Sequence, residues 1–215
     1  MNRVIPTVFA DNEREFRNRF NRLIGIAKKI QIDLMDGKFV KVKSIRIEDI
    51  PNLRKYKIDF EVHLMVENPD RLLDVLVKKG FKKIIFHYEA IENVKEFVKE
   101  IQKKDAEAWI AVNPDTDMIG VLPFLQEIDG LLFMGHTPGF ERLELENKVV
   151  ENIKKVRKSM KGLKIQVDGG VNLDNIEKLA KIRVNYVNVG SSVANSSNPK
   201  EMLKELERRF DKAFP

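Results

Sequence analysis

The feature that most constrains this chain is a repeated alternation of two apolar patterns along its length. Short runs rich in β-branched and aromatic residues, typical of strands, alternate with amphipathic stretches whose apolar residues recur at helical spacing. Eight strand candidates occur, at residues 3–9, 30–35, 60–66, 82–88, 106–112, 130–135, 163–170 and 184–190. Helical stripes are formed by Phe16, Phe20, Leu23, Ile24 and Ala27, by Leu72, Leu73, Leu76 and Val77, by Val94, Phe97, Val98 and Ile101, by Val149, Val150, Ile153 and Val156, and by Met202, Leu203, Leu206 and Phe210.

The number of these repeats favours one fold within the α/β class. Alternating strands and helices predict a parallel sheet with right-handed crossovers. Eight units in 215 residues, near the lower limit of about 200 for the fold, predict a (β/α)8 TIM barrel rather than an open doubly wound sheet. No Gly/Ser-rich linker interrupts the series, so residues 1–215 are expected to form one domain, with only a short helix in segment 41–57.

Composition narrows the chemistry that such a barrel can carry. The chain has no cysteine, which excludes disulfides, thiolate metal sites and a cysteine nucleophile and leaves His, Asp and Glu as reactive groups. The net charge of +6 comes from mixed runs such as "KEFVKEIQKKDAE", which are typical of solvated helix faces and not of nucleic-acid binding. No stretch approaches the roughly 20 apolar residues of a membrane span, and no signal-peptide core is seen. We therefore expect a soluble, cytoplasmic protein whose mild positive field favours an anionic small molecule.

Polar residues occupy alternate positions near the ends of several strand candidates. Because successive strand residues point to opposite faces, residues two apart share a face. In a barrel, functional groups gather where the strands end, at the C-terminal face. One inward face is thus expected to carry Gln31, Asp33, Met35, Glu61, His63, Met65, Met134, His136, Gln166 and Asp168. This set offers an acid, a base, metal ligands and a soft apolar wall.

The order and spacing of short motifs resemble those of the ribulose-phosphate 3-epimerase family. The motifs are "IDLMDGKFV", "EVHLMVENPD", "FHYEA", "NPDT", "LLFMGHTPGF", "VDGGVNLDNI" and "VGSSVA". The resemblance implies a ribulose-phosphate-binding barrel that acts as an isomerase of the pentose phosphate pathway. Enzymes of this family interconvert D-ribulose 5-phosphate and D-xylulose 5-phosphate by removing the C3 proton from one face and returning a proton on the other. By motif position, the two catalytic carboxylates would be Asp33 and Asp168.

The resemblance also implies one divalent metal ion, zinc, manganese, iron or magnesium. Its ligands would be Asp33, His63 and Asp168, with Gln31 where the family typically has a histidine. A neutral amide oxygen is a poor ligand for zinc or iron, so weaker metal binding or altered selectivity is expected. One hypothesis is that His136, placed where the family usually has a small apolar residue, partly replaces the missing imidazole. The alternative is a histidine bonded to backbone or substrate, and His87 is likewise interpreted as a hydrogen-bonded structural group.

The family's substrate contacts fall on residues of several loops. Gly169, Gly170, Gly190 and Ser191, at the ends of the seventh and eighth strand candidates, would bind a phosphate through backbone amides, although tight turns alone would also need glycine. In the altered loop "PGFERLELEN", Glu141 would repel a phosphate if it pointed inward, and Arg142 would compensate. The remaining substrate contacts implied by the resemblance are Thr7, Met35, His63, Met65, Met134, His136 and Gly139.

Two alternatives to a ribulose-phosphate 3-epimerase stay open. One is a 3-epimerase of a six-carbon ketose phosphate on the same barrel. The other is a catalytically silent relative that binds a sugar phosphate or a protein partner. Retention of both aspartates favours an enzyme, because a silent site has no physical reason to keep two carboxylates in a barrel mouth. The oligomeric state is left open, and a homo-oligomer is compatible with the sequence.

Overall fold

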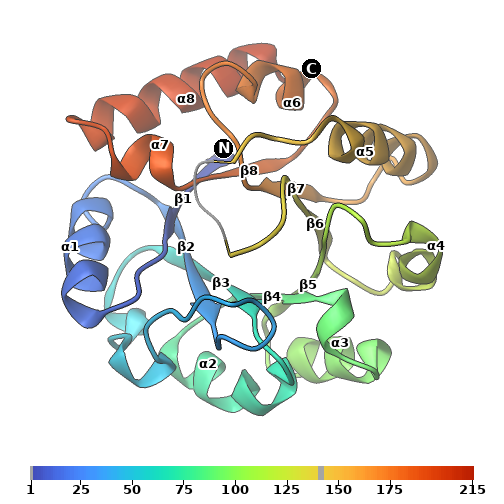
Figure 1. Ribbon diagram of the computed structural model, residues 1–215, viewed down its shortest axis with the longest axis horizontal. Coiled ribbons are helices and arrows are strands. Elements are labelled where there is room, and N and C mark those ends of the chain that lie inside the picture. Colours follow the sequence, from blue (N-terminus) through green and yellow to red (C-terminus); the bar gives the residue numbers. More distant parts are fainter. Residues whose placement is uncertain (1, 140–142) are drawn as a thin grey trace.

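The computed structural model describes residues 2–139 and 143–215, and its strands form a closed parallel barrel (Figure 1). The ring runs in sequence order from β1 to β8, and β1 pairs with β8 to close it. The TIM barrel predicted from the sequence is thereby confirmed, and the open sheet is wrong. The strands are β1 Val4–Val8, β2 Lys29–Met35, β3 Asp59–Met65, β4 Lys83–His87, β5 Glu107–Val112, β6 Gly130–Met134, β7 Ile165–Asp168 and β8 Tyr186–Val189.

Helices surround the ring and connect its strands (Figure 1). The α-helices are α1 Glu13–Leu23, α2 Leu73–Lys79, α3 Val94–Gln102, α4 Met118–Val121, α5 Asn147–Ser159, α6 Ile176–Lys181, α7 Ser191–Ala194 and α8 Pro199–Ala213. Short 3-10 helices are η1 Ile47–Asp49, η2 Leu53–Lys55, η3 Pro69–Leu72, η4 Tyr88–Ala90 and η5 Leu122–Phe124. Segment 41–57 holds only η1 and η2, in agreement with its weak helical pattern. No helix in the described parts of the chain is both long and apolar enough to cross a membrane.

Local sequence signals explain where the longer helices begin and end. The side chain of Asn12 accepts a hydrogen bond from the Glu15 amide at 2.9 Å and caps α1. Asn198 caps α8 in the same way, and Pro199 occupies its first turn. At the C-terminal end of α2, Gly80 adopts a left-handed conformation that ends the helix.

The strand register brings the predicted inward residues to the same levels of the barrel. Between β2 and β3, Gln31 lies opposite Glu61, and Asp33 lies opposite His63. Between β6 and β7, Met134 lies opposite Asp168. Polar groups two residues apart on one strand therefore stack in successive layers along the barrel axis.

The interior of the barrel is divided into an apolar and a polar part. On the side of β4 to β6, the buried residues Ile85, Trp109, Ala111, Leu132 and Met134 form a separate apolar cluster. Below the mouth, five polar side chains are buried to 9% exposure or less and form what we call the polar network. Its members are Gln31, Glu61, Lys83, Gln166 and Asn188. The larger core lies between the outer face of the sheet and the helices, so the polar network is enclosed by apolar packing.

Candidate active site

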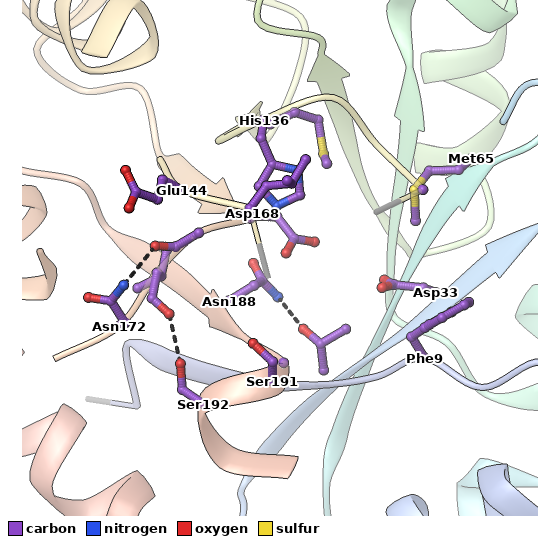
Figure 2. A pocket seen from close by; sticks show the side chains of 18 of the residues that line it. Phe9, Asp33, Met65, His136, Glu144, Asp168, Asn172, Asn188, Ser191 and Ser192 are labelled. Atoms are coloured by element: carbon purple, nitrogen blue, oxygen red, sulfur yellow. Dashed lines mark hydrogen bonds between the residues drawn. The ribbon is translucent and has the colours of Figure 1, made fainter. Parts of the chain in front are cut away.

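A cavity of about 400 Å³ opens at the C-terminal ends of the strands (Figure 2). Asp33 near the end of β2 and Asp168 at the end of β7 both face this cavity, with Met65 on its wall. The residues that line it are Thr7, Phe9, Arg19, Asp33, Met35, Met65, Met134, His136, Gly139, Leu143, Glu144, Asp168, Gly169, Gly170, Val171, Asn172, Asn188, Gly190, Ser191 and Ser192.

Asp33, His63 and Asp168 form a compact group at the floor of the cavity. One potential ligand atom of each lies within 4.8 Å of the others. His63 Nδ1 is 3.2 Å from Asp168 Oδ2 and 3.8 Å from Asp33 Oδ1. The two carboxylates are only slightly exposed, with side-chain exposures of 10% for Asp33 and 14% for Asp168, and His63 is fully buried. An imidazole and two carboxylates in this arrangement suit a divalent cation.

A chain of hydrogen bonds behind His63 determines which of its nitrogens faces the carboxylates. His87 Nδ1 lies 3.3 Å from Glu89 Oε2, and the two histidine Nε2 atoms lie 3.0 Å apart. Burial lowers the pKa of His87 to about 4, so its ring is neutral at neutral pH. Burial raises the pKa of Glu89, but its contacts with His87, Thr116 and the Asn113 amide together outweigh this effect and the net pKa is lowered. This carboxylate is therefore ionised and accepts a hydrogen bond from His87 Nδ1–H.

The hydrogen bonds of His87 determine whether His63 can bind a metal ion. If His87 donates from Nδ1 to Glu89, its Nε2 accepts a hydrogen bond from His63 Nε2–H. His63 Nδ1 then carries a lone pair that points at two carboxylates, an arrangement that a cation between them would stabilise. Asp33, His63 and Asp168 therefore fit a metal ion, with His87 and Glu89 orienting the imidazole.

Gln31 lies beneath the two aspartates and is fully buried. Its Nε2 donates to Asp33 Oδ1 at 2.8 Å and to Asp168 Oδ2 at 2.6 Å. Burial raises the pKa of Asp168, but the hydrogen-bonding and charged groups around it, Gln31 among them, together outweigh this effect and the net pKa is lowered. The amide thus stabilises the ionised form of a carboxylate that burial alone would neutralise.

Loops after β7 and β8 form the polar wall of the cavity. Gly169 and Gly170 have φ values of +106° and +71°, which residues other than glycine rarely adopt. A Cβ on Gly169 would lie 2.9 Å from His136 Nε2, and one on Gly170 would collide with the backbone of Leu145. The hydroxyl of Ser192 donates to the Val171 carbonyl at 3.0 Å and joins the start of α7 to the loop after β7 (Figure 2).

Most of the substrate contacts expected from the sequence line this cavity. They are Thr7, Met35, Met65, Met134, His136, Gly139, Gly169, Gly170, Gly190 and Ser191. His63 does not line it, and its side chain is fully buried. Arg142 and Glu141 lie outside the described residues.

His136 faces the cavity but is held by the backbone. Its Nδ1 lies 2.9 Å from the Thr137 carbonyl, and its side chain is nearly buried. The group of potential metal ligands found in the described chain consists of Asp33, His63 and Asp168. The contact that the structure shows for His136 is therefore the backbone bond of the alternative interpretation.

Several lining residues were not singled out from the sequence. Arg19, on α1, lines the cavity beside Thr7 and Gly190, and it is the only Lys or Arg among the described lining residues. It pairs with Glu15 one turn earlier at 2.6 Å. Its sequence signal was concealed because it belongs to a run of charged residues that reads as a solvated helix face. Asn188 was missed because a lone amide in a strand candidate carries no motif.

Comparisons with known proteins agree with this geometry. The family model described as "Ribulose-phosphate 3 epimerase family" matches residues 3–194. The ribulose-phosphate 3-epimerase of Eremothecium gossypii is 30% identical over 218 residues, which cover 95% of this chain and 91% of that protein. The cytoplasmic isoform of ribulose-phosphate 3-epimerase from Oryza sativa subsp. japonica is 27% identical, with coverages of 97% and 94%.

A solved structure supports the fold independently. The 3-keto-L-gulonate-6-phosphate decarboxylase of Vibrio cholerae superposes with a TM-score of 0.78 at 11% identity, and the match covers 99% of this chain and 98% of that one. At this identity the likeness concerns the barrel alone. From the family match and the curated relatives, the chain is an enzyme of the epimerase class and belongs to the ribulose-phosphate 3-epimerase family.

Proposed function

We propose that this enzyme interconverts D-ribulose 5-phosphate and D-xylulose 5-phosphate, with Asp33 and Asp168 as its acid/base pair. The observation that carries the proposal is the convergence of these two carboxylates in one nearly buried group at the floor of the cavity. They come from β2 and β7, which are separated in the closed ring by β8 and β1. Inversion at carbon requires a base and an acid on opposite sides of a planar intermediate, and two separate strands can supply them.

In each turnover one carboxyl group gains a proton from C3 and the other gives a proton to C3. One carboxylate accepts the C3 proton as the C3–H bond breaks, and the electron pair of that bond forms an enediolate with C2 and its oxygen. The other carboxyl group, protonated at the start, donates its proton to the opposite face of C3. A divalent ion held by Asp33, His63 and Asp168 would supply positive charge that stabilises the enediolate. Met35, Met65 and Met134 exclude water from this intermediate.

Removal of the metal should abolish most of the turnover. We expect chelator-treated protein to lose at least about a hundredfold in kcat, since charge stabilisation by a metal contributes several kcal/mol to the transition state. A coupled assay of D-ribulose 5-phosphate epimerisation, with zinc, manganese, iron(II) or magnesium added back separately, measures the loss and identifies the metal. Undiminished turnover after complete chelation would refute the metal requirement.

The same assay distinguishes the other candidates for the substrate. Six-carbon ketose phosphates are tested in parallel, and solvent deuterium incorporation at C3 is followed by NMR. Turnover of six-carbon substrates alone would replace the pentose assignment. Absence of C3 exchange with every sugar phosphate and metal would indicate the silent relative.

Arg19 is proposed to bind the substrate phosphate together with Gly169, Gly170, Gly190 and Ser191. The cavity is otherwise lined by the acids Asp33, Glu144 and Asp168, so a phosphate dianion would be repelled without a cation. Arg19→Met is expected to raise KM about tenfold with little change in kcat, because a charge-assisted hydrogen bond contributes about 1.5–3 kcal/mol. Inhibition by inorganic phosphate should weaken in parallel.

Arg17→Met is the matched control for this prediction. Arg17 lies on the same helix and is exposed at 71%, but it pairs with Glu13 and does not line the cavity. Equal kinetic effects of the two substitutions would show that net charge, and not contact with phosphate, is responsible.

We further propose that the whole chain, residues 1–215, is one catalytic domain. A cytoplasmic location is also proposed, supported by the name of the rice relative.

A further inference from the structure

The polar network beneath the aspartates takes no part in the proton transfers, yet it is fully connected and buried. We propose that Gln31 is a hydrogen-bond donor to the metal-ligating aspartates and not a fourth metal ligand. Its orientation is held by the buried ion pair of Lys83 and Glu61, which acts through Gln166. The consequence for the metal rests on the proposed function, whereas the orientation of Gln31 does not.

The ion pair fixes which end of the Gln166 amide faces which neighbour. Lys83 Nζ lies 3.0 Å from Glu61 Oε2 and donates to Gln166 Oε1. Gln166 Nε2 donates to Glu61 Oε1 and to Asn188 Oδ1, each at 2.6 Å. Rotating this amide by half a turn would place its NH2 against an ammonium group and its oxygen against a carboxylate. Both contacts would be repulsive, so one orientation is strongly preferred.

Gln166 in turn favours one orientation of Gln31. The Gln166 Nε2 atom lies 3.4 Å from Gln31 Oε1. Because its two protons serve Glu61 and Asn188, this contact is a weak electrostatic attraction between the NH2 group and the oxygen of Gln31. The NH2 group of Gln31 is then the end that reaches Asp33 and Asp168. If the Gln31 amide were turned over, its NH2 would face the NH2 of Gln166, and its oxygen would face the carboxylates of Asp33 and Asp168. Both contacts would be repulsive.

Burial makes this arrangement difficult to rearrange. Gln31 and Gln166 have 0% exposure, Glu61 has 4% and Lys83 has 9%. The ammonium group of Lys83 lies over the ring of Trp109, with Nζ 3.4 Å from the ring centroid. Because solvent has little access to these groups, any amide that turned over would lose its partners at a cost of about 1–3 kcal/mol for each unsatisfied group.

The consequence is a metal site with three protein ligands. Asp33, His63 and Asp168 supply the ligands, and the Gln31 NH2 orients one oxygen of each aspartate. Three protein ligands would leave room for the oxygens of a bound ketose. Lys83, Glu61 and Gln166 are positioning residues in this arrangement, because none of them lines the cavity.

The orientation can be measured in metal-free protein by NMR of side-chain amides. We expect the Gln31 NH2 protons, assigned by their loss in Gln31→Met, to be shifted downfield and to exchange slowly, as expected of protons bonded to carboxylates. Glu61→Leu/Lys83→Met removes both charges together, and Gln166→Met cuts the connection while keeping the ion pair. In either variant only the two aspartates still hold the amide, so its NH2 protons should exchange with solvent faster than in the wild type. The second variant keeps the test valid if the first fails to fold.

Visible spectra of the Co(II)-loaded protein test the ligand count. Gln31→Met should keep the wild-type spectrum, because no ligand is lost, and should bind Co(II) about tenfold more weakly, as is typical when a group that orients metal ligands is removed. Gln166→Met should change the spectrum, since Gln31 can then turn its oxygen to the metal. The double variant Gln31→Met/Gln166→Met should again show the spectrum of the wild type, because Gln31 can no longer act as a ligand.

Two results would overturn the proposal. If the Co(II) spectrum of Gln31→Met differed from that of the wild type as it does when a ligand is lost, Gln31 would be a metal ligand. If the Gln31 amide signals of both network variants were those of the wild type, the ion pair would not hold its orientation. Failure of the wild type to bind Co(II), with the amide signals as expected, would instead refute the proposed metal while leaving the orientation of Gln31 intact.

Discussion

Asp33→Asn and Asp168→Asn should each reduce epimerisation by about 10³- to 10⁴-fold, the upper range for loss of a general acid or base. Each amide keeps the shape of the carboxyl group but cannot exchange a proton with C3. In the coupled assay the loss should appear in kcat for both directions of the reaction.

The two variants should differ in which sugar exchanges its C3 proton with solvent. With one carboxylate left, the enzyme can still remove and return a proton on a single face. We therefore expect one variant to exchange deuterium into D-ribulose 5-phosphate and the other into D-xylulose 5-phosphate. Exchange into the same epimer by both variants would contradict the two-base mechanism, because it would place both carboxylates on one face.

Lys83→Met should cause the largest loss of stability among single substitutions in the polar network. It leaves Glu61 as a buried charge with 4% exposure and removes the donor to Gln166. Removing one partner of a buried ion pair costs about 3–5 kcal/mol. For a chain of this length the loss corresponds to a fall of roughly 10 °C in Tm, which thermal unfolding followed by circular dichroism would measure.

The double substitution Glu61→Leu/Lys83→Met is the control for this effect. Replacing both partners with apolar residues of similar size leaves no orphaned charge, so most of the stability should return. If the double variant were as unstable as Lys83→Met, packing around Lys83 and not its charge would be the cause.

The alternation along the chain was sufficient to predict the barrel and the inward faces of its strands. Strand parity alone places Asp33, His63 and Asp168 on the interior, because side chains alternate along a strand with a period of two. The closed ring then brings β2, β3 and β7 to one mouth, where these residues meet. The aspartates and the histidine were therefore predictable as a group.

The polar network could not be predicted, because its partners are far apart in the sequence. Gln31 and Gln166 are separated by 135 positions, and Lys83 and Gln166 by 83. Sequence patterns identify Glu61 and Gln166 as inward residues but do not show which end of an amide faces which neighbour. That information exists only once the ring has closed. For this reason Gln31 is expected from the sequence to be a weak ligand, whereas in the structure it donates hydrogen bonds to both aspartates.

The pairing of β1 with β8 has a consequence for how copies of this protein could assemble. Because every strand in the ring has a neighbour on both sides, the sheet has no edge to which a strand from another chain could be added. Any homo-oligomer must therefore form through the outer helices and the connecting loops. Association can then change without altering the strand pairing that holds the two aspartates in place.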